Sequence, residues 1–88
     1  MSNGINQGKM DDILSVVMGE LEDASNKSPA FHTPHEGYAI IKEEFDELWQ
    51  AVMLRQSDAT RNHMMRKEAI QVAAMVLRFL HDLEEVKL

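Results

Sequence analysis

The sequence predicts an all-α protein, built from an antiparallel helical hairpin and one further helix at the N-terminal side. In three segments the apolar residues recur at steps of three and four, the spacing of one helix face. Polar or proline-containing breaks separate these segments, and none shows the alternation of a β-strand. With 88 residues, 44% of them hydrophobic and 27% charged, the chain has the composition and length of one globular domain.

The first nine residues are expected to form a flexible tail, with a single domain over residues 10–88. Their Ser, Asn and Gly residues surround one isolated Ile, too little apolar surface to offset the entropy lost on ordering. From Asp11 a helical pattern begins behind two acidic residues, which suit a helix start. Its apolar face comprises Ile13, Leu14, Val17, Met18, Leu21 and Ala24. Ser, Asn and Pro residues within 24–32 end this helix in a polar connection.

A second helix is predicted from Pro34 to about Gln56. Thr33 suits the N-cap, Pro34 the first helical position, and Glu36 stands three residues after the cap, as in a capping box. The apolar stripe consists of Tyr38, Ile41, Phe45, Leu48, Trp49 and Val52. Residues 57–60 then make a short polar break.

A third helix is predicted from near Arg61 to the C-terminus. Its apolar face comprises Ile70, Val72, Ala73, Val76, Leu77, Leu80 and Leu83. Two long helices joined by about four residues pack antiparallel. Because a lone core is marginal at this size, we expect the helical bundle to be completed by self-association, as a homodimer or homotetramer.

Composition excludes several classes of protein. Lys and Arg number 9 against 15 Asp and Glu, and the resulting net charge of -6 argues against nucleic-acid and anionic-membrane partners. Without cysteine there is no disulfide scaffold, thiolate zinc site or cysteine nucleophile. The first residues lack the apolar core of a signal peptide, and no stretch approaches the roughly 18 apolar residues of a membrane span. We therefore expect a cytoplasmic protein.

Acidic residues intrude on the apolar faces of both hairpin helices. At about 100° per residue, Leu48 lies about 40° to one side of Glu44 and Ile40 about 40° to the other, with Glu47 one turn further on. Glu68 of the third helix is flanked by apolar residues in the same way. Ionised carboxylates in a helix–helix interface are costly unless a cation meets them. Oxygen ligands without Cys or an obligatory His suit Mg2+ or Mn2+.

Two short motifs carry a resemblance to a known family. The segment 43–47, EEFDE, resembles the E-E-x-x-E motif of the MazG-like all-α nucleoside triphosphate pyrophosphohydrolases. The segment 68–71, EAIQ, resembles its partner motif E-x-x-D, with 20 residues between the two blocks. The resemblance covers about His35 to Leu83 and implies hydrolysis of a (deoxy)nucleoside triphosphate to the monophosphate and pyrophosphate.

The resemblance also implies roles for individual residues. Glu44, Glu47 and Glu68 would be ligands of Mg2+, or of Mn2+ in its place, and Glu43 would support the site or orient the attacking water beside Glu44. Gln71 stands where the family pattern has Asp, and its amide oxygen can still coordinate although it attracts a divalent ion less.

Among the basic residues, Lys67 and Arg78 are the better placed to contact a triphosphate. Family members usually continue into a further helix that covers the nucleotide, and a partner subunit is expected to supply that wall here. The alternative is a non-catalytic helical interaction module. In that module a partner's Lys or Arg neutralises the acidic pocket, and Gln71 marks the loss of metal binding.

Overall fold

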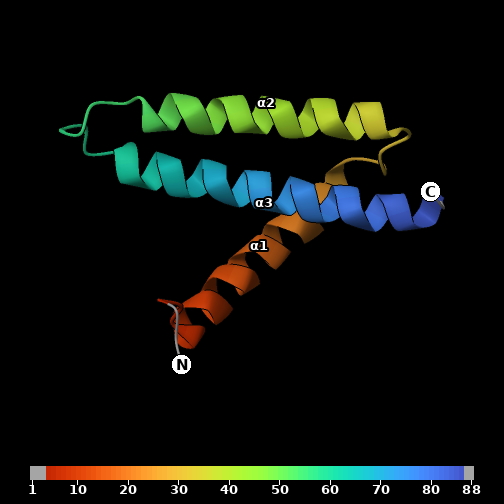
Figure 1. The fold of residues 1–88 in the computed structure, drawn as a ribbon, viewed down its shortest axis with the longest axis horizontal. Helices are drawn as coiled ribbons and strands as arrows, with labels where there is room; N and C mark the ends of the chain where they lie inside the picture. The colour runs from red at the N-terminus through yellow and green to blue at the C-terminus, as the bar shows by residue number, and fades with distance from the viewer. Residues whose placement is uncertain (1–3, 87–88) are drawn as a thin grey trace.

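The computed structural model describes residues 4–86, which form three α-helices and, over that range, no strand (Figure 1). They are α1 (Gln7–Lys27), α2 (Pro34–Val52) and α3 (Arg61–Val86). The all-α prediction is confirmed. In Figure 1, α2 and α3 lie side by side and run in opposite directions, whereas α1 slants away from them. Within residues 4–86, α1 and α2 each pack on α3, and no Cα atom of one lies within 8 Å of a Cα atom of the other.

The first helix begins earlier and ends later than the sequence pattern predicts. Asn6 is its N-cap, and the Asn6 side-chain oxygen accepts a hydrogen bond of 2.9 Å from the backbone N–H of Lys9. This cap starts the helix at Gln7, so the last three residues of the expected tail 1–9 are helical; residues 1–3 lie outside the described range. At the other end the helix continues to Lys27.

The start of α2 agrees with the prediction from the capping sequence. The Thr33 hydroxyl accepts a hydrogen bond of 3.1 Å from the backbone N–H of Glu36, and Pro34 opens the helix. The Glu36 carboxylate reaches back to the backbone N–H of His32, at 3.0 Å. The helix ends at Val52 rather than near Gln56, and the Arg61 guanidinium donates two hydrogen bonds to the Val52 carbonyl.

Few apolar side chains are buried. Val17 of α1 meets Ala74 and Met75 of α3, and this small cluster is extended by half-buried residues of α1, α2 and the connection between them. Among the described residues, no large side chain is fully buried. The packed interior of this chain is therefore thin.

Gly37 is buried in the first turn of α2, against Phe79 of α3 and Phe31 of the connection before it. A Cβ atom at this position would lie 2.5 Å from Phe79 Cδ1 and 2.9 Å from Phe31 Cδ2. Both contacts are with aromatic rings, which cannot move aside as the end of a flexible chain can. The absence of a side chain at Gly37 thus sets how closely the two helices approach.

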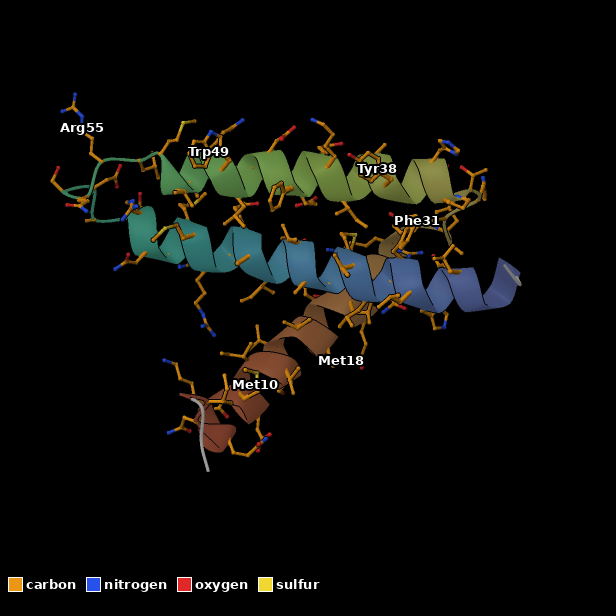
Figure 2. All side chains as sticks on the ribbon, viewed as in Figure 1. Met10, Met18, Phe31, Tyr38, Trp49 and Arg55 are labelled. Carbon is orange, nitrogen blue, oxygen red and sulfur yellow. The ribbon has the colours of Figure 1, made fainter. Side chains whose placement is uncertain are left out.

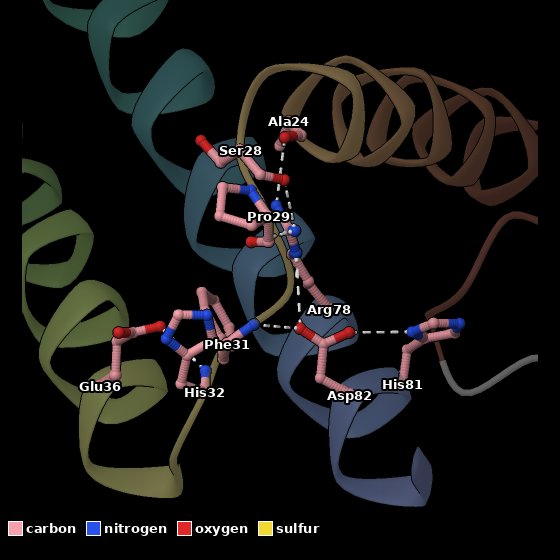
Figure 3. Close-up of polar contacts among 9 residues, drawn as sticks. All are labelled: Ala24, Ser28, Pro29, Phe31, His32, Glu36, Arg78, His81 and Asp82. Carbon is pink, nitrogen blue, oxygen red and sulfur yellow. Dashed lines mark hydrogen bonds and ion pairs between the residues drawn. The ribbon is translucent and has the colours of Figure 1, made fainter.

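Arg78 and Asp82 of α3 hold the segment between α1 and α2 in place (Figure 3). Arg78 is 5% exposed, and its guanidinium donates to the carbonyls of Ala24, Ser28 and Pro29 at 3.1, 2.7 and 2.6 Å. The same group lies over the Phe31 ring, 5.3 Å from its centroid.

The Asp82 carboxylate completes this network. It accepts a hydrogen bond of 2.9 Å from the backbone N–H of Phe31 and lies 3.5 Å from Arg78 Nε. Burial alone would raise the pKa of Asp82, but hydrogen bonds from His81 and Phe31 and the charge of Arg78 hold this pKa below its usual range. Asp82 is therefore an ionised, buried partner of Arg78.

We predict that Gly37→Ala lowers the free energy of unfolding by about 1–3 kcal/mol, because the added methyl group overpacks the contact with two aromatic rings. The matched control is Gly19→Ala in α1, where nothing lies within 4 Å of the new Cβ. There the better helix propensity of Ala is expected to stabilise the protein by up to about 1 kcal/mol. Urea unfolding followed by circular dichroism measures both values. Equal effects of the two substitutions would contradict the close approach at Gly37.

We predict that Arg78→Met lowers the free energy of unfolding by about 3–5 kcal/mol, because it leaves Asp82 buried without its cation and the carbonyls of Ser28 and Pro29 without their donor. Lys42→Met is the control: it removes the exposed Lys42–Asp46 ion pair and is expected to cost less than about 1 kcal/mol. Thermal unfolding of both variants tests the difference, and a loss at Arg78 no larger than that at Lys42 would refute the role of this network.

Candidate metal centre

Three glutamates from two helices meet at the seam between α2 and α3. Glu44 and Glu47 come from α2 and Glu68 from α3, and one carboxylate oxygen of each lies within 4.8 Å of the others. Glu44 and Glu47 are three residues apart, so they share one side of α2. Glu68 is only 8% exposed, Glu44 is half-buried and Glu47 is exposed. The cluster is therefore buried at Glu68 and open to solvent at Glu47.

The electrostatics of this cluster disfavour three negative charges. Burial, and then the charge and hydrogen bonding of Glu47, raise the pKa of Glu44 to about 7, with smaller contributions from Glu68 and Glu43. Burial and Glu47 also raise the pKa of Glu68. Without a cation, the cluster thus retains protons to a pH at which carboxyl groups are ordinarily ionised.

No basic side chain in the described range forms an ion pair with these glutamates. The ion pairs found there are Lys42–Asp46, Arg78–Asp82 and His81–Asp82. Lys67 lowers the pKa of Glu68, but this effect is the smallest acting on that group. Three oxygen donors around one point, with no protein cation paired to them, fit a hard divalent ion such as Mg2+ or Mn2+.

Two further residues expected at the site, Glu43 and Gln71, have other surroundings than the three glutamates. Glu43 is exposed on α2 and acts on Glu44 through its charge. Gln71 is half-buried, and its side-chain amide donates a hydrogen bond to the carboxylate of Glu20 in α1. The amide nitrogen of Gln71 is therefore engaged by α1, and coordination of an ion by its amide oxygen stays a prediction.

Lys67 and Arg78, both expected to bind substrate, have different surroundings. Lys67 lines a pocket of about 270 Å³ between α1 and α3, which Glu20, His63, Arg66 and Gln71 also line. Arg78 is buried in the network with Asp82 and the carbonyls described above, and ten residues separate it from Glu68 along α3. The prediction that Arg78 binds substrate is not supported, because its donors already serve the fold.

Sequence reasoning missed two residues of this surface, Glu20 and His63. His63 stands one turn before Lys67, and this four-residue spacing could have placed both on one side of the third helix. No signal of that kind was available for Glu20, because its position depends on the angle at which α1 crosses α3.

Comparisons with known proteins add no relative: no protein-family model matches the chain, and no curated protein or solved structure is significantly similar to it. In the described part of the chain, no helix is long and apolar enough to cross a membrane. The geometry of the three glutamates and the two motifs that contain them are therefore the features that point to a function.

We predict that, in EDTA, the melting temperature falls as the pH rises from about 4.5 to above 7. The raised pKa of Glu44 means that its contribution to stability is full below the unfolded value of 4.5 and is lost as the pH passes about 7. Glu44→Gln is expected to flatten this fall, whereas Asp12→Asn, at an exposed position of α1, should retain it. Comparing each variant with the parent chain removes the contributions of the other titrating groups. Parallel pH profiles of the Glu44→Gln variant and the parent chain would contradict the prediction.

Proposed function

We propose that the chain is a small metal-dependent nucleoside triphosphate pyrophosphohydrolase of the MazG-like type. Its reaction is hydrolysis of a (deoxy)nucleoside triphosphate to the monophosphate and pyrophosphate. The observation that carries the proposal is the convergence of Glu44, Glu47 and Glu68 from two helices at one point, at the spacing of the two motifs.

In this proposal each residue near the cluster has a defined role. Glu44, Glu47 and Glu68 hold Mg2+ or Mn2+, which supplies charge for the phosphate oxygens and lowers the pKa of a bound water. Glu43, exposed beside them, helps to orient the attacking water. Lys67 meets the negative charge of the phosphates, and Arg66, which lines the same pocket, adds a second positive charge.

The second candidate is a non-catalytic helical interaction module, and the contact between Gln71 and Glu20 favours it. The family pattern has an Asp where Gln71 stands, so the site lacks a fourth carboxylate, and the amide nitrogen of Gln71 is engaged by Glu20 of α1. In this case a Lys or Arg of a protein partner neutralises the glutamates, and the chain responds to no divalent ion specifically.

The enzyme hypothesis predicts that the purified chain with Mg2+ or Mn2+ converts at least one nucleoside triphosphate to monophosphate and pyrophosphate, and that EDTA stops the reaction. Glu44→Gln is expected to reduce turnover at least about 100-fold, because it removes a charged ligand. The control is Asp46→Asn, which changes an exposed carboxylate of the same motif segment that pairs with Lys42 and should retain turnover. Anion-exchange chromatography resolves the products.

Two results would separate the candidates. An enzyme gains thermal stability with millimolar Mg2+ or Mn2+, since an ion that binds only the folded state shifts the unfolding equilibrium. Absence of turnover with every triphosphate, together with a melting temperature that neither ion changes, would reject the enzyme and favour the interaction module.

A further inference from the structure

Gln71 lies one helical turn from the glutamate cluster, because it follows Glu68 by three residues along α3. The two helices of the seam run in opposite directions, so a step forward along α3 matches a step back along α2 (Figure 1). Glu68 and Glu47 meet in the cluster, and Glu44 stands three residues before Glu47. Gln71 therefore lies at the level of Glu44 along the helix pair.

The side chain of Gln71 also reaches α1. Its Nε2 atom donates a hydrogen bond to the carboxylate of Glu20, which is half-buried. Figure 2 shows Met10 where α1 slants away from α3 and Met18 nearer to the crossing of the two helices, and Glu20 follows Met18. Within residues 4–86, no hydrogen bond to the Gln71 oxygen is found. The contact therefore holds the amide group by its nitrogen and leaves the oxygen able to coordinate an ion.

No basic side chain of the described chain neutralises Glu20. Arg66 and Lys67 line the same pocket, yet the ion pairs found within residues 4–86 do not include this carboxylate. The partner of Glu20 there is the neutral amide of Gln71. A carboxylate that accepts from an amide nitrogen polarises the amide group and increases the negative charge on its oxygen. Glu20 thus makes the Gln71 oxygen a better ligand for a cation.

Metal ligands in proteins commonly donate a hydrogen bond from their other end to a carboxylate, which fixes the ligand and raises its basicity. Gln71 and Glu20 have the chemistry of such a pair. Gln71 stands where the resembled motif has a charged residue, and the missing negative charge is present behind it, on α1. With Glu44, Glu47 and Glu68, the site then has four carboxylates, three of them in the cluster and one acting through the amide.

We propose that Glu20 is a positioning residue of the metal centre: it orients the amide of Gln71, whose oxygen joins the three glutamates as a ligand. The inference rests on the proposed function, because it needs an ion at the cluster. It makes α1 part of the site, although both motifs lie on α2 and α3. The interaction module gives the same contact the opposite meaning, the withdrawal of Gln71 from the cluster. The affinity of the chain for a metal ion separates the two meanings.

Titration of the full chain with Mn2+ in the absence of nucleotide, followed by electron paramagnetic resonance of the unbound ion, tests the proposal. Glu20→Gln is expected to raise the Mn2+ dissociation constant at least about 10-fold. The variant side chain can still accept from Gln71, so its melting temperature in EDTA should stay within about 3 °C of that of the parent chain. The control is Glu22→Gln, which removes the same charge at an exposed position of α1 and should change the constant less than about twofold.

A second background shows whether Glu20 acts through Gln71. In a Gln71→Met chain, which has no ligand oxygen at this position, the further change Glu20→Gln is expected to alter the Mn2+ dissociation constant less than about twofold. An unchanged constant in Glu20→Gln alone, or an equal loss in both backgrounds, would overturn the proposal. A parent chain that binds no Mn2+ would overturn it together with the metal centre. A parent chain that binds Mn2+ but hydrolyses no triphosphate would reject the proposed activity alone, so the two failures are distinguishable.

Discussion

The connecting residues 28–33, like α1 and α2 themselves, are held against α3, and the buried pair of Arg78 and Asp82 is the interaction that fixes them there. The buried guanidinium of Arg78 donates hydrogen bonds to three backbone carbonyls, and the Asp82 carboxylate accepts one from the backbone N–H of Phe31. The Ser28 and Pro29 carbonyls and this N–H belong to a connection with no helix of its own to satisfy them, whereas the Ala24 carbonyl lies in the last turn of α1. A charged pair inside a thin core is tolerated because each partner has several hydrogen bonds.

The glutamate cluster has the opposite electrostatic character. Arg78 and Asp82 have opposite charges and compensate one another, whereas Glu44, Glu47 and Glu68 repel one another across the seam. The seam accommodates them by raising the pKa of Glu44 and Glu68. A bound divalent ion would replace the protons held there, so that ion binding, folding stability and pH are linked through the same three side chains.

The thin core and the exposed aromatic residues are two aspects of one constraint. The helix pair presents apolar residues to more than one side, and α1 covers only part of α3. Apolar surface of this extent is ordinarily buried by association.

The sequence alone determined the three helices, because each has a 3.6-residue apolar period. The second also has a capping sequence, in which the Thr33 hydroxyl accepts from the backbone N–H of Glu36. The same period placed Glu44 and Glu68 toward the apolar seam, since rotation about a helix is a local property. The helix ends were predicted less accurately. The Asn6 cap starts α1 at Gln7 rather than near Asp11, and α2 ends at Val52, whose carbonyl accepts from Arg61, rather than near Gln56.

Tertiary structure decided the rest, in particular which polar groups remain available at the candidate site. Gln71 and Arg78 both carry suitable chemistry, yet one is bonded to Glu20 and the other is buried under the connection between α1 and α2. Both outcomes depend on the angle at which α1 crosses α3. No local pattern encodes that angle, because it results from packing between residues about 50 positions apart in the chain.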